Sequence, residues 1–123
     1  MKLFHALSVP VLSLMMAGSV LASDAKPESL PAGQHMYVIE RNMPGLGQLA
    51  PADLKAASQK SCRVLQHLGP DIVWLQSYVT GDKMYCVYLA PNAQLVREHA
   101  QEGGFPADAV NEVTTIIGPQ TAK

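Results

Sequence analysis

Residues 72–90 have the sequence IVWLQSYVTGDKMYCVYLA, and this stretch decides the fold. Two runs within it, Ile72–Thr80 and Lys83–Ala90, are rich in β-branched and aromatic residues, which favour strands. Only Gly81 and Asp82 separate the two runs. A link of two residues with glycine first is typical of a type II′ turn, so the stretch is predicted to form a β-hairpin.

One strand and one helix are predicted on the N-terminal side of the hairpin. The strand is His35–Arg41, because its centre is rich in β-forming residues. After a loop at 42–50, a helix is predicted over Pro51–Leu68, since proline suits the first helical position and Gly69-Pro70 ends the helix. Residues at helical spacing define its predicted buried stripe, which comprises Leu54, Ala57, Ser61, Cys62, Leu65 and Leu68.

A second helix and a last strand follow the hairpin. Asn92 is predicted to cap a helix that runs to Glu102 and stops at Gly103-Gly104. The segment Val110–Ile117 is predicted to be the final strand. The order strand, helix, strand, strand, helix, strand predicts an α+β, ferredoxin-like βαββαβ fold, with two helices on one face of an antiparallel four-stranded sheet.

The N-terminal segment predicts export. Residues 1–22 have the features of a signal peptide: Lys2, an apolar run, and the small-x-small cleavage pattern at Val20–Ala22. A retained membrane anchor is the alternative, but Pro10 interrupts a run that is already short for a bilayer span. Residues 23–34 are then a polar, flexible tether, and residues 35–123 form one domain. The protein is predicted to be periplasmic or secreted, without membrane attachment after cleavage.

The charge of the chain excludes some partners. Nine basic and ten acidic residues give a formal net charge of −1. No basic patch or run is present, so neither nucleic acid nor an anionic lipid surface is expected as a partner.

Strand alternation predicts which hairpin residues share a face. With a two-residue turn, one face carries Val73, Leu75, Ser77, Val79, Met84, Cys86 and Tyr88, and this face is assigned to the helices. The other face carries Trp74, Gln76, Tyr78, Tyr85, Val87 and Leu89, which is too apolar for water. A homodimer formed through this sheet face is the favoured explanation, and coverage by the tether or by the 42–50 loop is the alternative. A bulge would reverse the assignment of the faces.

Three soft or borderline metal ligands are predicted to converge between the helices and the sheet. Cys62 lies on the predicted stripe of the first helix, Cys86 points toward the helices, and His99 follows Leu95 by one helical turn. Thiolate and imidazole suit zinc, copper, iron or nickel. Glu40 and Tyr78 could supply oxygen ligands at the dimer face. The structural alternatives are a disulfide between the cysteines, or buried groups without a metal.

Nucleophilic and nucleotide chemistry have little support. The chain contains no Gly-x-Ser-x-Gly elbow, no Cys–His–Asn signature and no glycine-rich phosphate loop after a strand. A thiol catalyst built on Cys86 and His99 is the remaining option for an enzyme. A non-catalytic protein is therefore favoured.

Several motifs resemble one family of small bacterial proteins. They are WLQSYVTGDKMYCVY at 74–88, REHA at 97–100 and GFP at 104–106. That family was long labelled a domain of unknown function and includes a nickel-binding, nickel-responsive protein. The resemblance spans residues 35–123 and implies a ferredoxin-like fold, a dimer, and metal binding without catalysis. The polar positions that match the family are Tyr78, Cys86, Glu98 and His99. The export signal and the Ala-Pro-Ala-Asp opening of the first helix depart from its usual pattern.

The leading hypothesis is an exported dimer that binds a transition metal, with nickel as the candidate. Two other classes stay open. One is a small-molecule enzyme resembling the dimeric α/β-barrel monooxygenases, which would need an apolar pocket with converging polar groups between helices and sheet. The other is a structural interaction module that recruits a partner through the aromatic sheet face.

Overall fold

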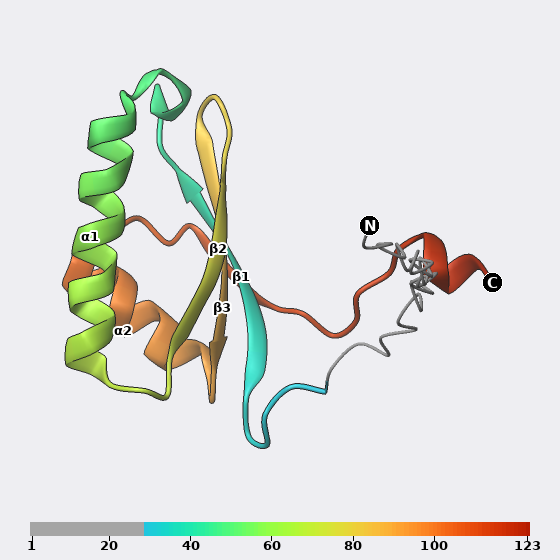
Figure 1. The fold of residues 1–123 in the computed structure, drawn as a ribbon. Coiled ribbons are helices and arrows are strands. Elements are labelled where there is room, and N and C mark those ends of the chain that lie inside the picture. Colours follow the sequence, from blue (N-terminus) through green and yellow to red (C-terminus); the bar gives the residue numbers. More distant parts are fainter. Residues whose placement is uncertain (1–28) are drawn as a thin grey trace, which may run out of the picture.

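Residues 29–123 are described by the structure, a computed structural model (Figure 1). In chain order the elements are β1 (His35–Asn42), the short 3-10 helix η1 (Leu46–Gln48), α1 (Pro51–Leu68), β2 (Val73–Val79), β3 (Lys83–Ala90), α2 (Ala93–Gly103), β4 (Ala109–Glu112) and η2 (Pro119–Ala122). The predicted signal peptide, 1–22, and residues 23–28 of the predicted tether lie outside the described residues. Within them, no helix has the length and apolar character that a membrane span needs.

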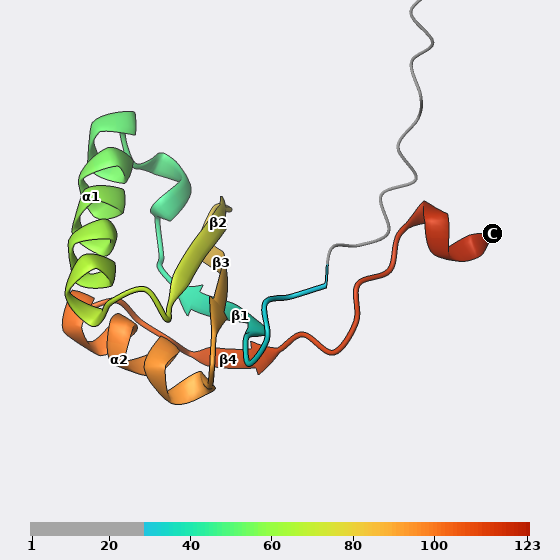
Figure 2. The same ribbon diagram turned by 60° about the horizontal axis from the view of Figure 1, so that its bottom comes forward.

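The four strands form one antiparallel sheet in the order β2-β3-β1-β4. Both helices, α1 and α2, lie on the same side of this sheet, and no helix of residues 29–123 packs on the other side (Figures 1 and 2). The predicted ferredoxin-like α+β fold is therefore confirmed. One face of the sheet forms the core with the helices, and we call the opposite side the outer face.

The helix boundaries follow from local chemistry. Pro51 occupies the first turn of α1, and Ala50 makes no side-chain cap, so the acidic Asp53 is what favours the helix dipole there. Helix α1 ends at Gly69, whose φ of 93° is unfavourable for residues with a side chain. The Asn92 side chain accepts a hydrogen bond of 2.9 Å from the Leu95 backbone N–H and so caps α2. The predicted bounds of α1 are confirmed, and those of α2 are confirmed to within one residue.

Replacing Asn92 by alanine should lower the free energy of unfolding by about 1 kcal/mol, because the Leu95 N–H loses its acceptor. Urea denaturation of the wild type and the variant measures this difference. Asn92→Asp is the matched control and should change the free energy of unfolding by only a few tenths of a kcal/mol, roughly, since its side-chain oxygen still accepts from the Leu95 N–H. Equal losses in the two variants would contradict the role given to the side-chain oxygen.

The predicted faces of β2 are partly wrong. Ser77 pairs with Cys86 and Tyr78 with Tyr85, as predicted, but Trp74 pairs with Tyr88 and Gln76 with Val87. Leu75 is therefore the extra residue of a β-bulge, and the alternation reverses N-terminal to it. Trp74 consequently faces the helices rather than the outer face. Val73, predicted to face the helices, pairs with Leu89 on the outer face and is 43% exposed.

The last strand is shorter than predicted. Strand β4 covers four residues and pairs with Tyr37–Glu40 of β1. The backbone N–H of Val113 makes one further bond to the Met36 carbonyl, and β1 itself begins at His35. The chain beyond Val113 therefore has no partner strand to pair with, and it leaves the sheet (Figure 1). Ile116 and Ile117, which the prediction placed in the strand, are exposed.

The hairpin turn has the predicted length but not the predicted type. The Thr80 N–H bonds to the Lys83 carbonyl at 2.9 Å, so Gly81 and Asp82 form the whole link. Gly81 lacks the positive φ that a type II′ turn requires. The 43–47 loop holds the turn instead, because the N–H groups of Met43 and Gly47 donate to the carbonyls of Asp82 and Gly81. A Cβ on Gly47 would lie 2.9 Å from Gly81 Cα, so this contact requires glycine.

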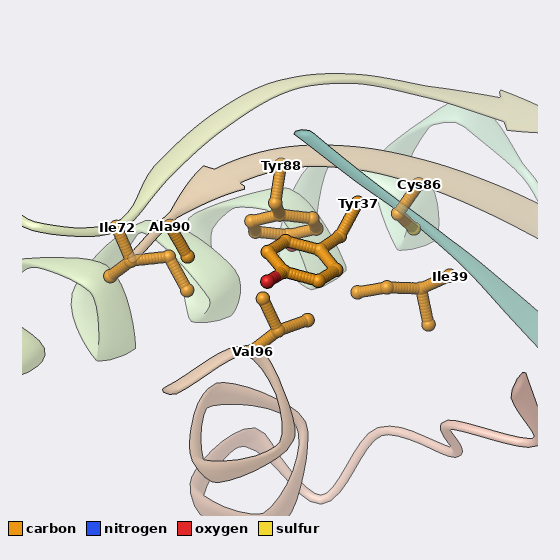
Figure 3. Close-up of a cluster of buried hydrophobic side chains, with 7 residues drawn as sticks. All are labelled: Tyr37, Ile39, Ile72, Cys86, Tyr88, Ala90 and Val96. Carbon is orange, nitrogen blue, oxygen red and sulfur yellow. The ribbon is translucent and has the colours of Figure 1, made fainter. Parts of the chain in front are cut away.

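The hydrophobic core lies between the inner face of the sheet and α2. Seven buried side chains form it: Tyr37, Ile39, Ile72, Cys86, Tyr88, Ala90 and Val96 (Figure 3). Residues 37 and 39 alternate with outer-face residues along β1, which is the period expected of a strand with one covered face. The end of the predicted tether joins this domain, since the Gln34 side chain donates to the Asp71 carbonyl at 3.1 Å.

Candidate functional site

Arg41 is a buried cation on the inner face of the sheet. It continues the alternation of Tyr37 and Ile39 along β1, and only 2% of its surface is exposed. Its Nε donates to Cys86 Sγ at 3.3 Å and its Nη1 donates to the Pro106 carbonyl. The guanidinium also lies 5.5 Å from the centre of the Phe105 ring, a cation–π contact. A charge held this deep normally has an ionic partner.

A cavity of about 160 Å³ opens beside Arg41, between α1 and the strands β2 and β3. Its walls are mainly apolar and include Leu54, Ala57, Trp74, Val79, Met84 and Phe105. Residues with hydroxyl groups, namely Ser58, Ser61, Ser77 and Tyr88, also line it. An apolar pocket with a few polar groups is what the enzyme alternative requires, so the structure leaves that alternative open.

His99 lies behind this cavity and is fully buried. Its Nε2 is 3.0 Å from Ser61 Oγ, and its ring packs against Tyr88 and Phe105 at centroid distances of 5.1 and 5.9 Å. Its Nδ1 is buried without a hydrogen-bond partner in the described part of the chain. Burial first, and the nearby charge of Arg41 second, lower the pKa of His99 below its ordinary value. The imidazole is therefore held neutral at pH 7.

The predicted convergence of Cys62, Cys86 and His99 is not observed. Cys62 is exposed, whereas the buried residues of α1 are Ser61, which the predicted stripe included, and Val64, which it did not. Cys86 is buried, and both cysteines are free thiols rather than a disulfide. Within residues 29–123, no three His, Cys, Asp or Glu side chains are arranged to hold a metal ion.

The interior of the domain does not fit a transition metal. Cys86 Sγ already accepts a hydrogen bond from the Arg41 guanidinium, and that positive charge would oppose a bound cation. His99 would supply one imidazole, and its Nε2 is engaged with Ser61. A typical site needs several N, O or S donors around the ion.

Two other predicted ligands lie together on the outer face. Tyr78 and Glu40 both pair with Tyr85, from β2 and β1 respectively, so the three side chains form one row across the sheet. Tyr78 is 57% exposed, and its hydroxyl accepts a hydrogen bond from the Gln76 amide. Glu40 forms an ion pair with Lys83, whose pKa is raised by that hydrogen bond and charge. Glu98, the remaining position that matches the resembled family, is exposed on α2 and contacts Gln94.

Comparison with known proteins decides the family. The model of the nickel responsive protein SCO4226-like family matches residues 37–113, more than half of the chain. The chain belongs to this family. The crystal structure of SCO4226 from Streptomyces coelicolor A3(2) aligns with a TM-score of 0.57 and 20% sequence identity, over 67% of this chain and 99% of that one. No curated protein sequence matches the chain significantly.

The part of the chain that matches the SCO4226-like family contains both features described above. It includes Arg41 and the cavity, and also the Glu40–Tyr85–Tyr78 row. The sequence analysis named Glu40 and Tyr78 as candidates but did not predict that Tyr85 joins them in one row, and it missed Arg41. The available signal was the period of two along β1, which places position 41 on the same face as Tyr37 and Ile39.

Proposed function

We propose that the protein is an exported homodimer that binds a transition metal, with nickel as the candidate. The observation that carries this proposal is membership of a family described as nickel responsive. The interior lacks a suitable donor set, so the proposed site lies on the outer face and is completed by a second copy. A two-fold axis would supply each donor twice.

Glu40 and Tyr78 are the donors that we assign to this site. They lie in one row of the outer face, and a carboxylate and a phenol oxygen can both ligate a divalent transition metal. Lys83 competes with a metal for Glu40, because the two side chains form an ion pair. A metal would therefore have to displace the Lys83 ammonium, which makes the charge of Glu40 central to binding.

The proposed dimer buries the outer face. Val73 is 43% exposed there, Tyr78 is more exposed still, and Tyr85, Val87 and Leu89 are half-buried beside them. Contiguous apolar side chains on a bare sheet face commonly mark an interface. Pairing through this face would cover both patches at once and bring the two Glu40–Tyr85–Tyr78 rows together.

Export rests on the leader that ends at Ala22. The mature chain would begin at Ser23 and would meet its metal outside the cytosol, where thiols tend to be oxidised. Glu40 and Tyr78 are oxygen donors, so a site made from them does not depend on the redox state of the cysteines.

Native mass spectrometry of untagged protein tests all three parts of the proposal in one measurement. The subunit mass should correspond to a chain that begins at Ser23, and the assembly should contain two subunits. Titration with nickel should add a whole number of ions per dimer. Glu40→Gln and Tyr78→Phe should each weaken nickel binding by about tenfold or more, since each removes one donor type from both subunits.

Glu98→Gln is the matched control, because it removes an exposed carboxylate from α2, on the opposite side of the sheet. It should leave nickel binding unchanged. Absence of stoichiometric nickel binding by the wild type would contradict the metal proposal. A monomer at micromolar concentration would contradict the dimer and leave the outer face to a different partner.

A further inference from the structure

The charge of Arg41 has no carboxylate partner in the part of the chain that the structure describes. The ion pairs within residues 29–123 join His35 to Glu112, His67 to Glu102 and Lys83 to Glu40. The guanidinium has five N–H groups, and its hydrogen bonds to Cys86 Sγ and the Pro106 carbonyl leave others free to donate. A buried charge in this state is costly, and an anion beside it would offset that cost.

The cavity places an empty space next to this charge. Arg41 lines it, and no aspartate or glutamate among the described residues does. Arg41 therefore gives the cavity wall a positive charge that no lining carboxylate neutralises.

The remaining walls suit an apolar group. Trp74, Met84 and Phe105 face the cavity from β2, β3 and the segment after α2. An apolar cavity of roughly 150 Å³ is enough to hold a benzene molecule in another protein. The cavity here has a similar volume, about 160 Å³. It reaches the surface at β2, the edge strand, where the lining residue Val79 is 44% exposed.

We propose that this cavity binds a small organic monocarboxylate, whose carboxylate pairs with Arg41 and whose apolar body packs against Trp74, Met84 and Phe105. The volume limits the ligand to the size of benzoate or a short branched aliphatic acid. Among residues 29–123, Arg41 is the one charged residue that lines the cavity, so a monoanion is favoured over a phosphate or a dicarboxylate. The site is separate from the outer face and does not depend on the proposed metal.

Trp74 provides a direct measurement, because it lines the cavity and is the only tryptophan of the chain. Titration of the purified protein with benzoate at pH 7 and constant ionic strength should change its fluorescence in a saturable way. Benzyl alcohol, which is neutral and of similar size, should bind about tenfold more weakly or worse, because it cannot form a charge-assisted pair with Arg41. Equal affinities, or no saturable change with benzoate, would overturn the proposal.

One pair of variants on α1 and one variant of Arg41 locate the site. Ala57→Leu fills the cavity from α1 and should weaken benzoate binding about tenfold, while Ala56→Leu, an exposed position on the same helix, should not change it. Arg41→Met should remove the preference for benzoate over benzyl alcohol. If Arg41→Met does not fold, the Ala57 and Ala56 variants decide alone. Unchanged binding by Ala57→Leu would show that benzoate binds elsewhere and would overturn the assignment.

Discussion

Replacing Tyr88 by alanine should lower the free energy of unfolding by about 3–5 kcal/mol, which is the usual cost of truncating a buried aromatic side chain. Tyr88 is 2% exposed and lies at the centre of the core (Figure 3). Its ring stacks on Trp74 at a centroid distance of 6.5 Å and makes a tilted contact with His99 at 5.1 Å, so it joins β2 to α2. Small domains are stable by only about 5–15 kcal/mol, and the loss would remove a large part of that.

Tyr88→Phe is the matched control for this experiment. It keeps the ring and removes only the hydroxyl, so it should cost about 1 kcal/mol. Urea denaturation followed by circular dichroism gives both values, and an unchanged m-value would show that the same surface unfolds in each variant. A loss for Tyr88→Ala close to that for Tyr88→Phe would contradict the central position of the ring.

The element order was predictable because each boundary has a local cause. Proline at position 51 and glycine at 69 fix α1, and Asn92 fixes the start of α2. Each of these effects depends on residues within one or two helical turns of one another, so it can be predicted from the sequence alone. The hairpin length followed from the same kind of local signal.

The faces of β2 were not predictable to the same degree. The bulge at Leu75 arises from how β2 pairs with β3, and no glycine or other residue marks it in the sequence. One extra residue was enough to move Trp74 from the outer face into the cavity wall. The predicted aromatic patch therefore lost its largest member, and the cavity gained it.

The candidate site was predicted least well, because it depends on helix rotation and on one buried charge. Cys62 is the exposed member of the predicted α1 stripe, so one proposed metal ligand is lost, while the hydroxyl of its neighbour Ser61 lies beside His99. Arginines are rarely buried, so composition gave no reason to place Arg41 inside. Its partners, Cys86 and the Pro106 carbonyl, are far from it in the sequence.

His99 should make the stability of the protein fall below neutral pH. The unfolded chain protonates this imidazole near its ordinary pKa of about 6.5. In the folded protein its pKa is lowered, by burial first and by Arg41 second. Ser61 from α1, Tyr88 from β3 and Phe105 surround the ring. The hydrogen bond with Ser61 and, less strongly, the charge of Glu102 on the same helix raise the pKa and so oppose this shift in part.

The sign of the effect follows from proton binding. Between the lowered pKa and about 6.5 the unfolded state binds more protons than the folded state, so the free energy of unfolding falls as the pH falls. One proton gives a slope of at most about 1.4 kcal/mol per pH unit. Urea denaturation at several pH values between roughly 7.5 and 5 measures this slope, above and below the ordinary histidine pKa.

His99→Gln should flatten the pH dependence, because glutamine keeps polar atoms near Ser61 but does not titrate. Its stability should also be lower at pH 7, since its amide fits the ring-shaped site between Tyr88 and Phe105 poorly. Asn92→Ala is the matched control: it lowers stability through the α2 cap, far from any change in protonation, and should keep the slope of the wild type. A wild-type slope that survives in His99→Gln would assign the pH dependence to other groups. If both variants lose the slope, lowered stability alone accounts for its loss. If His99→Gln loses the slope and Asn92→Ala keeps it, the buried imidazole is the source of the pH dependence.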